Sequence, residues 1–361
     1  MSRIAVILFN LGGPDSPQAV EPFLRNLFVD PAILRVPGLV RRFLAPFIAR
    51  RRAPTAQAIY AQMGGRSPIL PQTEAQAAAL DAALAARASA YTFRSFIAMR
   101  YWHPFSAETA AAVKTYAPDR IVLLPLYPQM STATSESSVI DWRRSARSAG
   151  LDVPTQAICC YPTQDGLIAT AATLIRRAYD PATEKGPVRL LFSAHGLPEK
   201  VIRAGDPYQW QVERTARSIV DRLAIADLDW AVCYQSRVGP LKWIGPSTDS
   251  EIRRAGSDGK AVVLFPIAFV SEHSETLVEL DIEYRELAHQ SGVRDYQRVA
   301  TVGVEAAFID GLADLVLRTA ADAACAISND AGVPACSADF SACPRRAGSG
   351  ATKLWTLTGA A

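Results

Sequence analysis

The stretch that decides the fold is VRLLFSAHG, residues 188–196. It begins as a mostly apolar run and ends in the turn signal SAHG. Similar apolar runs occupy residues 4–9, 121–126 and 261–265, and each ends at a turn that contains glycine or proline. Short, nearly continuous apolar runs are typical of parallel strands that are buried on both faces.

Helix-forming segments lie between these runs. Residues 73–88 are rich in Ala, Leu, Gln and Glu, and residues 208–223 are another good helix former. This alternation predicts an α/β fold with doubly wound parallel sheets. Because the pattern starts near residue 4 and again near residue 188, we expect two similar Rossmann-type lobes with a ligand cleft at the carboxyl ends of their strands. The predicted parts are residues 1–155, residues 156–325 and a cysteine-containing tail, residues 326–361.

Length, composition and charge limit the function classes. The chain has 361 residues, of which 49% are hydrophobic and 20% charged, and this is typical of a folded protein with more than one domain. A formal net charge of +3 is too small to indicate a nucleic-acid partner. The sequence has no recognisable signal peptide and no stretch of roughly 20 apolar residues. We therefore expect a cytoplasmic protein whose six cysteines are not paired in disulfides.

Two of the four histidines follow predicted strands of different α/β units. His195 lies at the end of the quoted stretch, and His273 lies in FVSEHSE, residues 269–275, soon after the run at 261–265. A lone histidine is usually structural or simply exposed. Two histidines at strand ends favour a shared cleft, because the carboxyl ends of parallel strands are where such sheets bind ligands.

A series of glutamates surrounds and follows His273. Glu275, Glu279 and Glu283 are four residues apart, which places them on one face of an α-helix. A solvated acidic surface is the plain alternative, although like charges at this spacing weaken a helix slightly. Because the stripe begins beside His273 and Glu272 at the end of an apolar strand, we favour a site for a divalent first-row cation or a proton path.

Two N-terminal segments carry weaker signals. The turn NLGGP, residues 10–14, lacks the GxGxxG pattern and the lysine of a phosphate loop. A tight turn that lets a flat ligand approach the backbone is at least as good an interpretation of this segment as a nucleotide site.

Residues 32–54 alternate arginines with Phe43, Phe47 and other apolar residues. This segment is either an ordinary amphipathic surface helix or a lip that meets a membrane or an anionic apolar ligand.

Further motifs occur in a recognisable order with those above. They are GGRSP at 64–68 after Tyr60, RYWHP at 100–104, LYPQ at 126–129, GDPY at 205–208 and QSRVGP at 235–240 before Trp243. Together with SAHGLP at 193–198 and with SEHSETL and ELDIEY between 271 and 284, this series closely resembles the ferrochelatase family over about residues 3–320.

The resemblance implies a lyase that holds a porphyrin between its lobes. Its substrates are then Fe²⁺ and protoporphyrin IX, and its reaction is the terminal step of haem biosynthesis. It implies that His195 and Glu275 form the iron site, with His273 as a third catalytic residue. Three further glutamates join the metal path: Glu272, Glu279 and Glu283.

The same resemblance implies a substrate site made of aromatic, apolar and polar side chains. Arg52 and Ser236 are expected to hold propionates. The other expected substrate-binding residues are Leu11, Phe47, Tyr60, Ser67, Arg100, Tyr101, Tyr208 and Trp243. Leu11 departs from those relatives that carry methionine there, so a thioether role in metal delivery is in doubt for this chain.

Alternatives to protoporphyrin ferrochelatase remain open at this stage. They are a coproporphyrin ferrochelatase, a cobalt or nickel chelatase that acts on an earlier tetrapyrrole, and a carrier that binds tetrapyrrole without metallating it. The apolar lip favours protoporphyrin, which carries fewer carboxylates than coproporphyrin. The expected partners are a porphyrin and ferrous iron, and no nucleic acid. Weak peripheral contact with the inner membrane and a homodimer are further expectations.

A [2Fe–2S] cluster is expected because some ferrochelatases carry one on C-terminal cysteines plus one cysteine of the body. Cys325, Cys336 and Cys343 lie in or near the tail, and Cys159 or Cys160 is the candidate fourth ligand. Because neighbouring strand residues face opposite ways, only one of that pair is expected to bind. Cys233 is expected in the core. Ordinary thiols are the alternative, since the spacing matches no ferredoxin run and the position that is cysteine in animal relatives lies in MST, residues 130–132.

Overall fold

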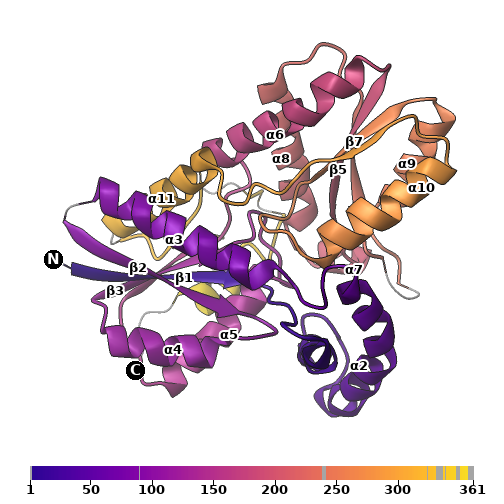
Figure 1. Cartoon of the computed structure of the whole chain (residues 1–361). Helices are drawn as coiled ribbons and strands as arrows, with labels where there is room; N and C mark the ends of the chain where they lie inside the picture. The colour runs from indigo at the N-terminus through magenta and orange to yellow at the C-terminus, as the bar shows by residue number, and fades with distance from the viewer. Residues whose placement is uncertain are drawn as a thin grey trace.

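Two parallel β-sheets form the centre of the molecule, which is described here as a computed structural model (Figure 1). Every pairing between named strands is parallel, and helices alternate with the strands along the chain. The predicted α/β class with two parallel sheets is therefore confirmed. The structure describes residues 2–88, 90–237, 241–322, 324–330, 336–337, 339–346 and 350–356.

The first sheet has the strand order β2-β1-β3-β4-β9. Residues alternate between its two faces along β1, and both faces are fully buried, which explains the unbroken apolar run. Helices α3 and α11 cover one face, and α4 and α5 cover the other (Figure 1). The strands are β1 (Ser2–Asn10), β2 (Tyr91–Met99), β3 (Arg120–Pro125), β4 (Thr155–Ile158) and β9 (Ile327–Ser328), and the helices are α3 (Ile69–Arg87), α4 (Ser106–Tyr116), α5 (Ser135–Ser148) and α11 (Ala306–Ala321).

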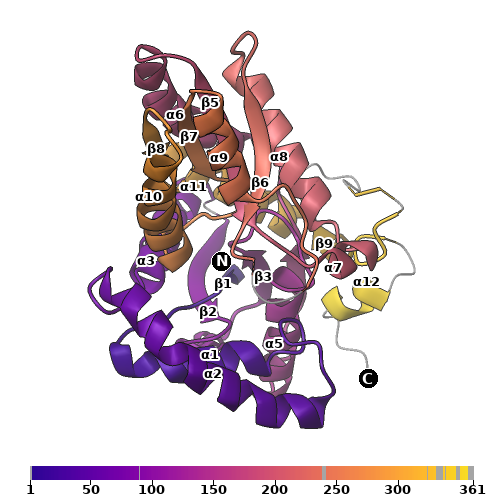
Figure 2. The ribbon, with the colours of Figure 1, turned by 90° about the vertical axis from the view of Figure 1, so that its right-hand side faces the viewer.

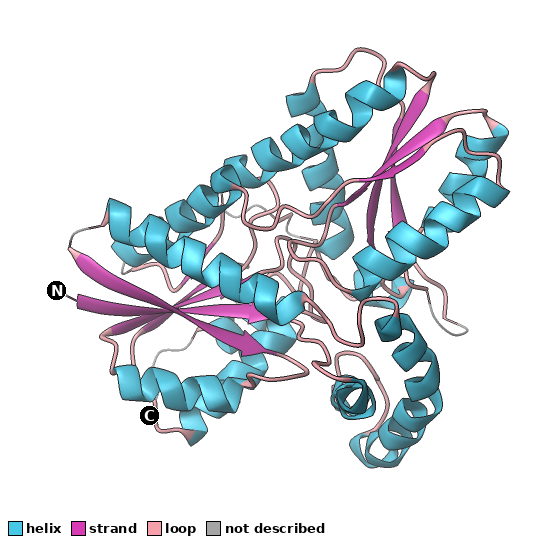
Figure 3. Ribbon diagram, in the orientation of Figure 1, coloured by secondary structure: helices cyan, strands magenta, loops and turns pink. Residues whose placement is uncertain are grey.

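The second sheet has the strand order β6-β5-β7-β8. Helices α6 and α8 cover one face and α9 and α10 the other, so this sheet is also a three-layer sandwich (Figure 3). The quoted stretch VRLLFSAHG supplies β5, the strand between β6 and β7. The elements are β5 (Val188–His195), β6 (Trp230–Gln235), β7 (Ala261–Pro266), β8 (Tyr296–Arg298), α6 (Asp165–Thr183), α8 (Tyr208–Leu223), α9 (Thr248–Ser257) and α10 (Tyr284–Gln290).

The chain passes between the sheets twice. It leaves the first sheet after β4 through α6, and it returns through α11, which packs against α3 and α6 before β9 joins β4. The largest hydrophobic cluster contains residues of both sheets, from Ile4 in β1 to Val263 in β7. The division at residues 155 and 325 stays a prediction.

The tail contains two short elements that the sequence pattern did not indicate. Strand β9 extends the first sheet, and α12 (Gly350–Trp355) packs against α5 with the Trp355 side chain buried. The indole and the strand pairing explain how a segment rich in small residues is attached to the body.

A helical pair projects from the first sheet beneath the second (Figure 2). It consists of α1 (Val20–Val29), which follows the 3₁₀ turn η1 (Pro17–Ala19), and α2 (Gly38–Ala61). Alanines 45, 49 and 53 of α2 are buried against α1, whereas Leu39, Phe43 and Phe47 are 77%, 78% and 63% exposed. We call the exposed apolar residues of α2, with Arg42, Arg50 and Arg51, the lip. No described helix is long and apolar enough to cross a membrane.

Candidate active site

Both predicted histidines meet Glu275 and Glu279, two of the four predicted glutamates, at the carboxyl ends of β5, β6 and β7. His195 is the last residue of β5, and His273 lies in the loop that follows β7. The glutamates then lie on η2 (Glu275–Glu283), a π-helix where the spacing had predicted an α-helix. Its wider turn is visible in the bond from the Tyr284 N–H to the Glu279 carbonyl five residues earlier. Single π-helical turns are frequent at functional sites.

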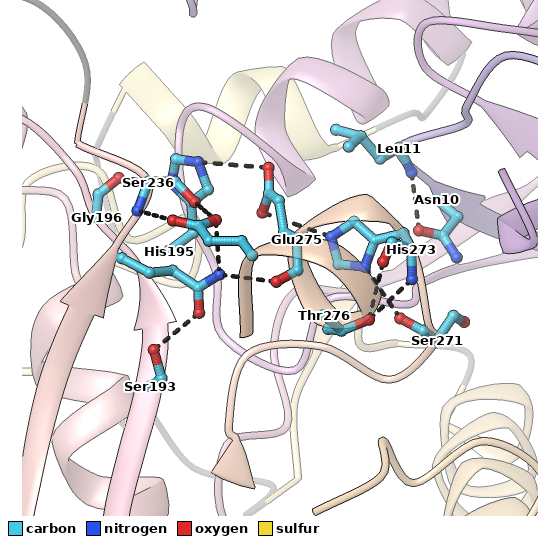
Figure 4. Close-up of polar contacts among 12 residues, drawn as sticks. Asn10, Leu11, Ser193, His195, Gly196, Ser236, Ser271, His273, Glu275 and Thr276 are labelled. Atoms are coloured by element: carbon cyan, nitrogen blue, oxygen red, sulfur yellow. Dashed lines mark hydrogen bonds and ion pairs between the residues drawn. The ribbon is translucent and has the colours of Figure 1, made fainter. Parts of the chain in front are cut away.

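Two imidazoles flank one carboxylate at this site (Figure 4). His195 Nε2 lies 3.7 Å from Glu275 Oε1, and His273 Nε2 lies 3.5 Å from Glu275 Oε2. Each carboxylate oxygen therefore faces a different ring. His273 is buried, whereas His195 and Glu275 are partly exposed. The arrangement brings together the three residues that the sequence predicted as catalytic.

The other ring nitrogen of each histidine faces a backbone carbonyl. His195 Nδ1 lies 2.7 Å from the Gly196 oxygen, and His273 Nδ1 lies 3.3 Å from the Ser271 oxygen. A carbonyl only accepts hydrogen bonds, so both Nδ1 atoms carry the proton and both Nε2 atoms face Glu275. Metal-binding histidines commonly have this partner on the second nitrogen.

The charge of Glu275 is stabilised despite its burial. Burial alone raises its pKa, but the charge of His195 and the hydrogen bond and charge of His273 outweigh burial and lower the pKa to about 2. Glu275 is therefore a carboxylate throughout the physiological pH range, beside two nitrogen bases. Mixed nitrogen and oxygen donors suit divalent first-row metals.

Glu279 lies beside Glu275 and is surrounded by donors. Gln235 Nε2 and Ser236 Oγ donate to Glu279 Oε2 at 3.1 and 2.5 Å. The Ser236 N–H and the Tyr284 hydroxyl donate to Oε1 at 2.9 and 3.3 Å. Burial, followed by the charge of Glu275, nevertheless raises the pKa of Glu279. The Ser236 hydroxyl, which was predicted to hold a propionate, is thus engaged by this carboxylate.

The two remaining glutamates of the predicted path differ from Glu275 and Glu279. Glu272 is ion-paired with Arg298 at 2.9 Å and accepts a hydrogen bond from the Thr301 N–H. Glu283 is exposed at the far end of the π-helix. Glu272 is therefore neutralised by a structural partner that is distant in the sequence, whereas the ionic contacts of Glu275 within the described residues are with the two imidazoles.

Helix α3 of the first sheet supports the loop that carries His273, a role that the sequence did not reveal. The buried Gln76 donates to the carbonyls of Val270 and Gly303 and accepts a hydrogen bond from Ser271 Oγ. Gln72 accepts a hydrogen bond from the Glu272 N–H at 2.6 Å. A run of helix-forming residues gives no signal of such contacts, because they depend on tertiary structure.

Three predicted aromatic residues lie next to the histidine and carboxylate group. Tyr60 of α2 hydrogen-bonds Ser274; burial is the main reason that its pKa is raised to about 12, and the nearby charge of Glu275 also raises it. The Tyr208 hydroxyl donates to the His195 carbonyl at 3.1 Å. The Trp243 ring packs so closely on Gly196 that a side chain there would lie 3.2 Å from it.

Other predicted substrate residues have different surroundings. Arg100 and Tyr101 both donate to the buried Asp30, at 2.7 and 2.9 Å, and Tyr101 is fully buried. Asp30 was not predicted, and it connects the end of α1 to both residues. Ser67 is buried against Gly13, Arg52 stacks on Phe28, Phe47 belongs to the lip, and Leu11 lies at the end of β1 (Figure 4).

Four of the six cysteines lie in one group. Strand β4 ends at Ile158, so Cys159 and Cys160 do not alternate as strand residues, and their sulfurs are 3.6 Å apart. Hydrogen bonds then link Cys160 to Cys336 and Cys336 to Cys343. The predicted opposite orientation of the adjacent pair is therefore wrong. Cys325 instead donates to the Ile327 carbonyl, and Cys233 is buried in β6 as predicted. Across the described ranges, no three His, Cys, Asp or Glu side chains are placed to hold a metal ion as they stand.

The molecule thus has two parallel sheets, with imidazole and carboxylate groups at the strand ends of the second. SirB from Bacillus subtilis with Fe³⁺ shares this fold with a TM-score of 0.54 at 12% identity, covering 90% of this chain and 98% of SirB. The ferrochelatase family model matches residues 3–320. Ferrochelatases of Caulobacter vibrioides (strain NA1000 / CB15N) and Phenylobacterium zucineum are 54% and 56% identical over 97% and 87% of this chain, and over 99% and 91% of their own lengths. The chain belongs to the ferrochelatase family, and it is a porphyrin metal chelatase, a lyase of haem biosynthesis.

Proposed function

We propose that this enzyme inserts Fe²⁺ into protoporphyrin IX to form protohaem. The observation that carries the proposal is the pair of Nε2 atoms on either side of Glu275, with both Nδ1 atoms held by backbone carbonyls. Ferrous iron is a substrate here, and the group offers it one carboxylate and two imidazole nitrogens. Family resemblance supports the same residues, His195 and Glu275, as the iron site.

Metal insertion releases two pyrrole N–H protons for each Fe²⁺ that enters the ring. In the proposed mechanism, His195 accepts a pyrrole proton through Nε2, because its Nδ1 is already protonated and fixed. Glu275 stabilises the resulting imidazolium, 3.7 Å away. His273 lies across Glu275 from His195, and Glu279 lies beside Glu275; in the proposed mechanism these two residues carry metal in or protons out. Aromatic walls, including Trp243 and Tyr60, hold the distorted ring, so part of the binding free energy is used for strain.

Replacement of His195 by Ala tests this assignment. The expected result is loss of chelation in an anaerobic assay with Fe²⁺, while porphyrin still quenches or shifts fluorescence on binding. His289→Ala is the matched control, since His289 is exposed on α10. Normal turnover by the His195→Ala protein would exclude His195 as the proton acceptor.

The lip supports protoporphyrin over coproporphyrin as the porphyrin substrate. Its large exposed side chains are apolar, and protoporphyrin has a more apolar edge than coproporphyrin. Initial rates with the two porphyrins at equal Fe²⁺ decide between them, and we expect a higher kcat/KM for protoporphyrin. The reverse order would identify a coproporphyrin ferrochelatase.

The lip also supports weak, peripheral binding to anionic membranes. Exposed phenylalanines beside arginines are the composition of interfacial helices, and contacts of arginine with lipid are screened by salt. We expect co-sedimentation with anionic vesicles at low salt that decreases at high salt and in a Phe43→Ser/Phe47→Ser variant. Absence of sedimentation at low salt would refute this part of the proposal.

A [2Fe–2S] cluster is the proposed resident cofactor. The support is that Cys159, Cys160, Cys336 and Cys343 supply four thiols linked by successive sulfur contacts, which would have to shift to surround a cluster. A bound cluster would supply one-electron redox chemistry and would join the tail to the body. Cys325 falls outside this group, so the proposed ligands are the other four. Gln211 of α8 donates to Cys336 at 3.2 Å and would remain beside a thiolate.

The cluster proposal is tested by the colour and the acid-labile sulfide of anaerobically purified protein. We expect a red-brown protein that bleaches in the Cys336→Ser variant and keeps its colour in the Cys325→Ser variant. Colourless wild-type protein without labile sulfide, expressed with ample iron, would rule the cluster out.

A further inference from the structure

We propose that Gln235 is a positioning residue that fixes Glu275 and Glu279 relative to His195. The inference rests on the proposed function, since it assumes that these carboxylates handle metal or protons. Gln235 is the last residue of β6, is 0% exposed and lies opposite His195 in the register of β5 and β6. Its carbonyl accepts a hydrogen bond from the Gly196 N–H at 2.9 Å. The backbone of Gln235 is thus tied directly to the turn that holds His195.

The side-chain amide of Gln235 reaches the π-helix. Its Nε2 donates to the Glu275 carbonyl at 3.2 Å and to Glu279 Oε2 at 3.1 Å. One planar amide therefore contacts two successive turns of the helix that carries both carboxylates. A change in its orientation would displace Glu279 directly and Glu275 through its backbone.

The orientation of this amide is fixed by a hydroxyl relay. Ser193 Oγ donates to Gln235 Oε1 at 2.8 Å, and the Thr248 hydroxyl lies 2.8 Å from the same Ser193 oxygen. Ser193 uses its one proton on Gln235, so Thr248 donates to Ser193. A flipped amide would place its oxygen against the Glu275 carbonyl and the Glu279 carboxylate, all three of which are acceptors. The network therefore permits one amide orientation.

The neighbouring residue adopts a strained conformation that serves the same carboxylate. Ser236 has φ of 61°, in the left-handed region that a serine rarely adopts. In that conformation both its N–H and its hydroxyl point to Glu279. The end of β6 is thus shaped to hold one carboxylate with three donors, in addition to the more distant Tyr284 hydroxyl.

The test compares Gln235→Met, which keeps the side-chain length and removes the amide, with Gln290→Met. Gln290 is an exposed glutamine on α10 whose amide also donates to a glutamate, Glu286. Initial rates are measured anaerobically against Fe²⁺ concentration, with the porphyrin that the wild-type enzyme metallates. Porphyrin Kd and Tm are measured on the same preparations.

For Gln235→Met we expect kcat/KM for Fe²⁺ to fall by about 10- to 100-fold, the usual effect of losing a residue that orients a metal-handling group. Porphyrin Kd should change by less than about twofold, because the amide faces the helix and not the ring. Ser193→Ala leaves the Gln235 amide in place but no longer fixes its orientation. This variant should reduce kcat/KM for Fe²⁺ by a smaller factor than Gln235→Met. That variant also serves as the test if Gln235→Met does not fold.

Two results would overturn the inference. One is a kcat/KM for Fe²⁺ in Gln235→Met and Ser193→Ala that matches Gln290→Met. The other is a loss of porphyrin affinity as large as the loss in kcat/KM for Fe²⁺, which would indicate general disruption of the site. A wild-type enzyme that binds porphyrin but does not insert Fe²⁺ would instead refute the proposed function, so the two failures are distinguishable.

Discussion

A glutamate in the first turn of α5 should make the stability of this protein fall between about pH 4.5 and 7. Glu136 lies in the first turn of α5, partly buried, near Asp206, Arg35 and Trp355. Burial, followed by the charge of Asp206, raises its pKa from 4.5 to about 7, although Trp355 and Arg35 oppose the rise. The native state therefore keeps a proton on Glu136 that the unfolded chain releases at lower pH.

The sign and size of the effect follow from this difference in pKa. Below pH 4.5 the Glu136 carboxyl is protonated in both the native and the unfolded state, so its titration does not change the free energy of unfolding. As the pH rises to about 7 the unfolded chain is favoured progressively, and above pH 7 the full cost applies. The rise in pKa corresponds to a loss of about 3 kcal/mol in the free energy of unfolding. Because Glu136 is partly exposed, we expect a loss of about 1–3 kcal/mol. For a chain of 361 residues that equals about 1–4 °C in Tm.

Glu136→Gln removes this titration and tests the argument. We expect the variant to have a higher Tm than wild type at pH 8 and a similar Tm at pH 4.5, measured by thermal unfolding across that range. Glu74→Gln, on the exposed face of α3, is the control for loss of a surface charge. Parallel Tm profiles of wild type and Glu136→Gln would refute the reasoning.

Three further predictions concern packing and buried charge. Gly166→Ala should lower the free energy of unfolding in urea by about 1–3 kcal/mol, because the new Cβ would lie 2.0 Å from the Ala307 carbonyl oxygen, whereas Gly38→Ala should not, because its Cβ would lie 3.9 Å from the Arg41 side chain, an ordinary contact. Arg298→Met should destabilise by about 3–5 kcal/mol, since Glu272 would be left largely buried without its cation; an unchanged urea midpoint would contradict this. Asp30→Asn should lower Tm, because Arg100 loses its nearest carboxylate; equal Tm values in calorimetry would show that Asp141, 4.0 Å away, suffices.

The sequence predicted the strands better than it predicted the details of the site. β1, β3, β5 and β7 are buried on both faces, so their apolar runs are long and distinct. The helices at 69–87 and 208–223 were also predicted, within a few residues. The pairing of His195, His273 and Glu275 followed from their positions after strands, because parallel strands bring their carboxyl ends to one edge.

Tertiary contacts explain what the sequence did not predict. Four-residue spacing of glutamates gives no sign of a π-helix, whose wider turn here accompanies the contacts of Gln235 and Ser236 with Glu279. Which glutamate is neutralised depends on Arg298, 26 residues after Glu272. The two-residue strand β9 is too short to have a pattern of its own and is defined by its pairing with β4.

The return of the chain to its first sheet has a consequence for synthesis on the ribosome. Strand β4 is made early, but its neighbour β9 and the covering helix α11 are encoded about 170 residues later. At roughly 5–20 residues per second, the nascent first sheet waits roughly 10 to 30 s with an open edge and with one apolar face covered by α3 without α11. During that interval the emerging chain presents a surface suited to chaperones and prone to aggregation. Loss of the last segment, by early termination or proteolysis, would make that unfinished surface permanent.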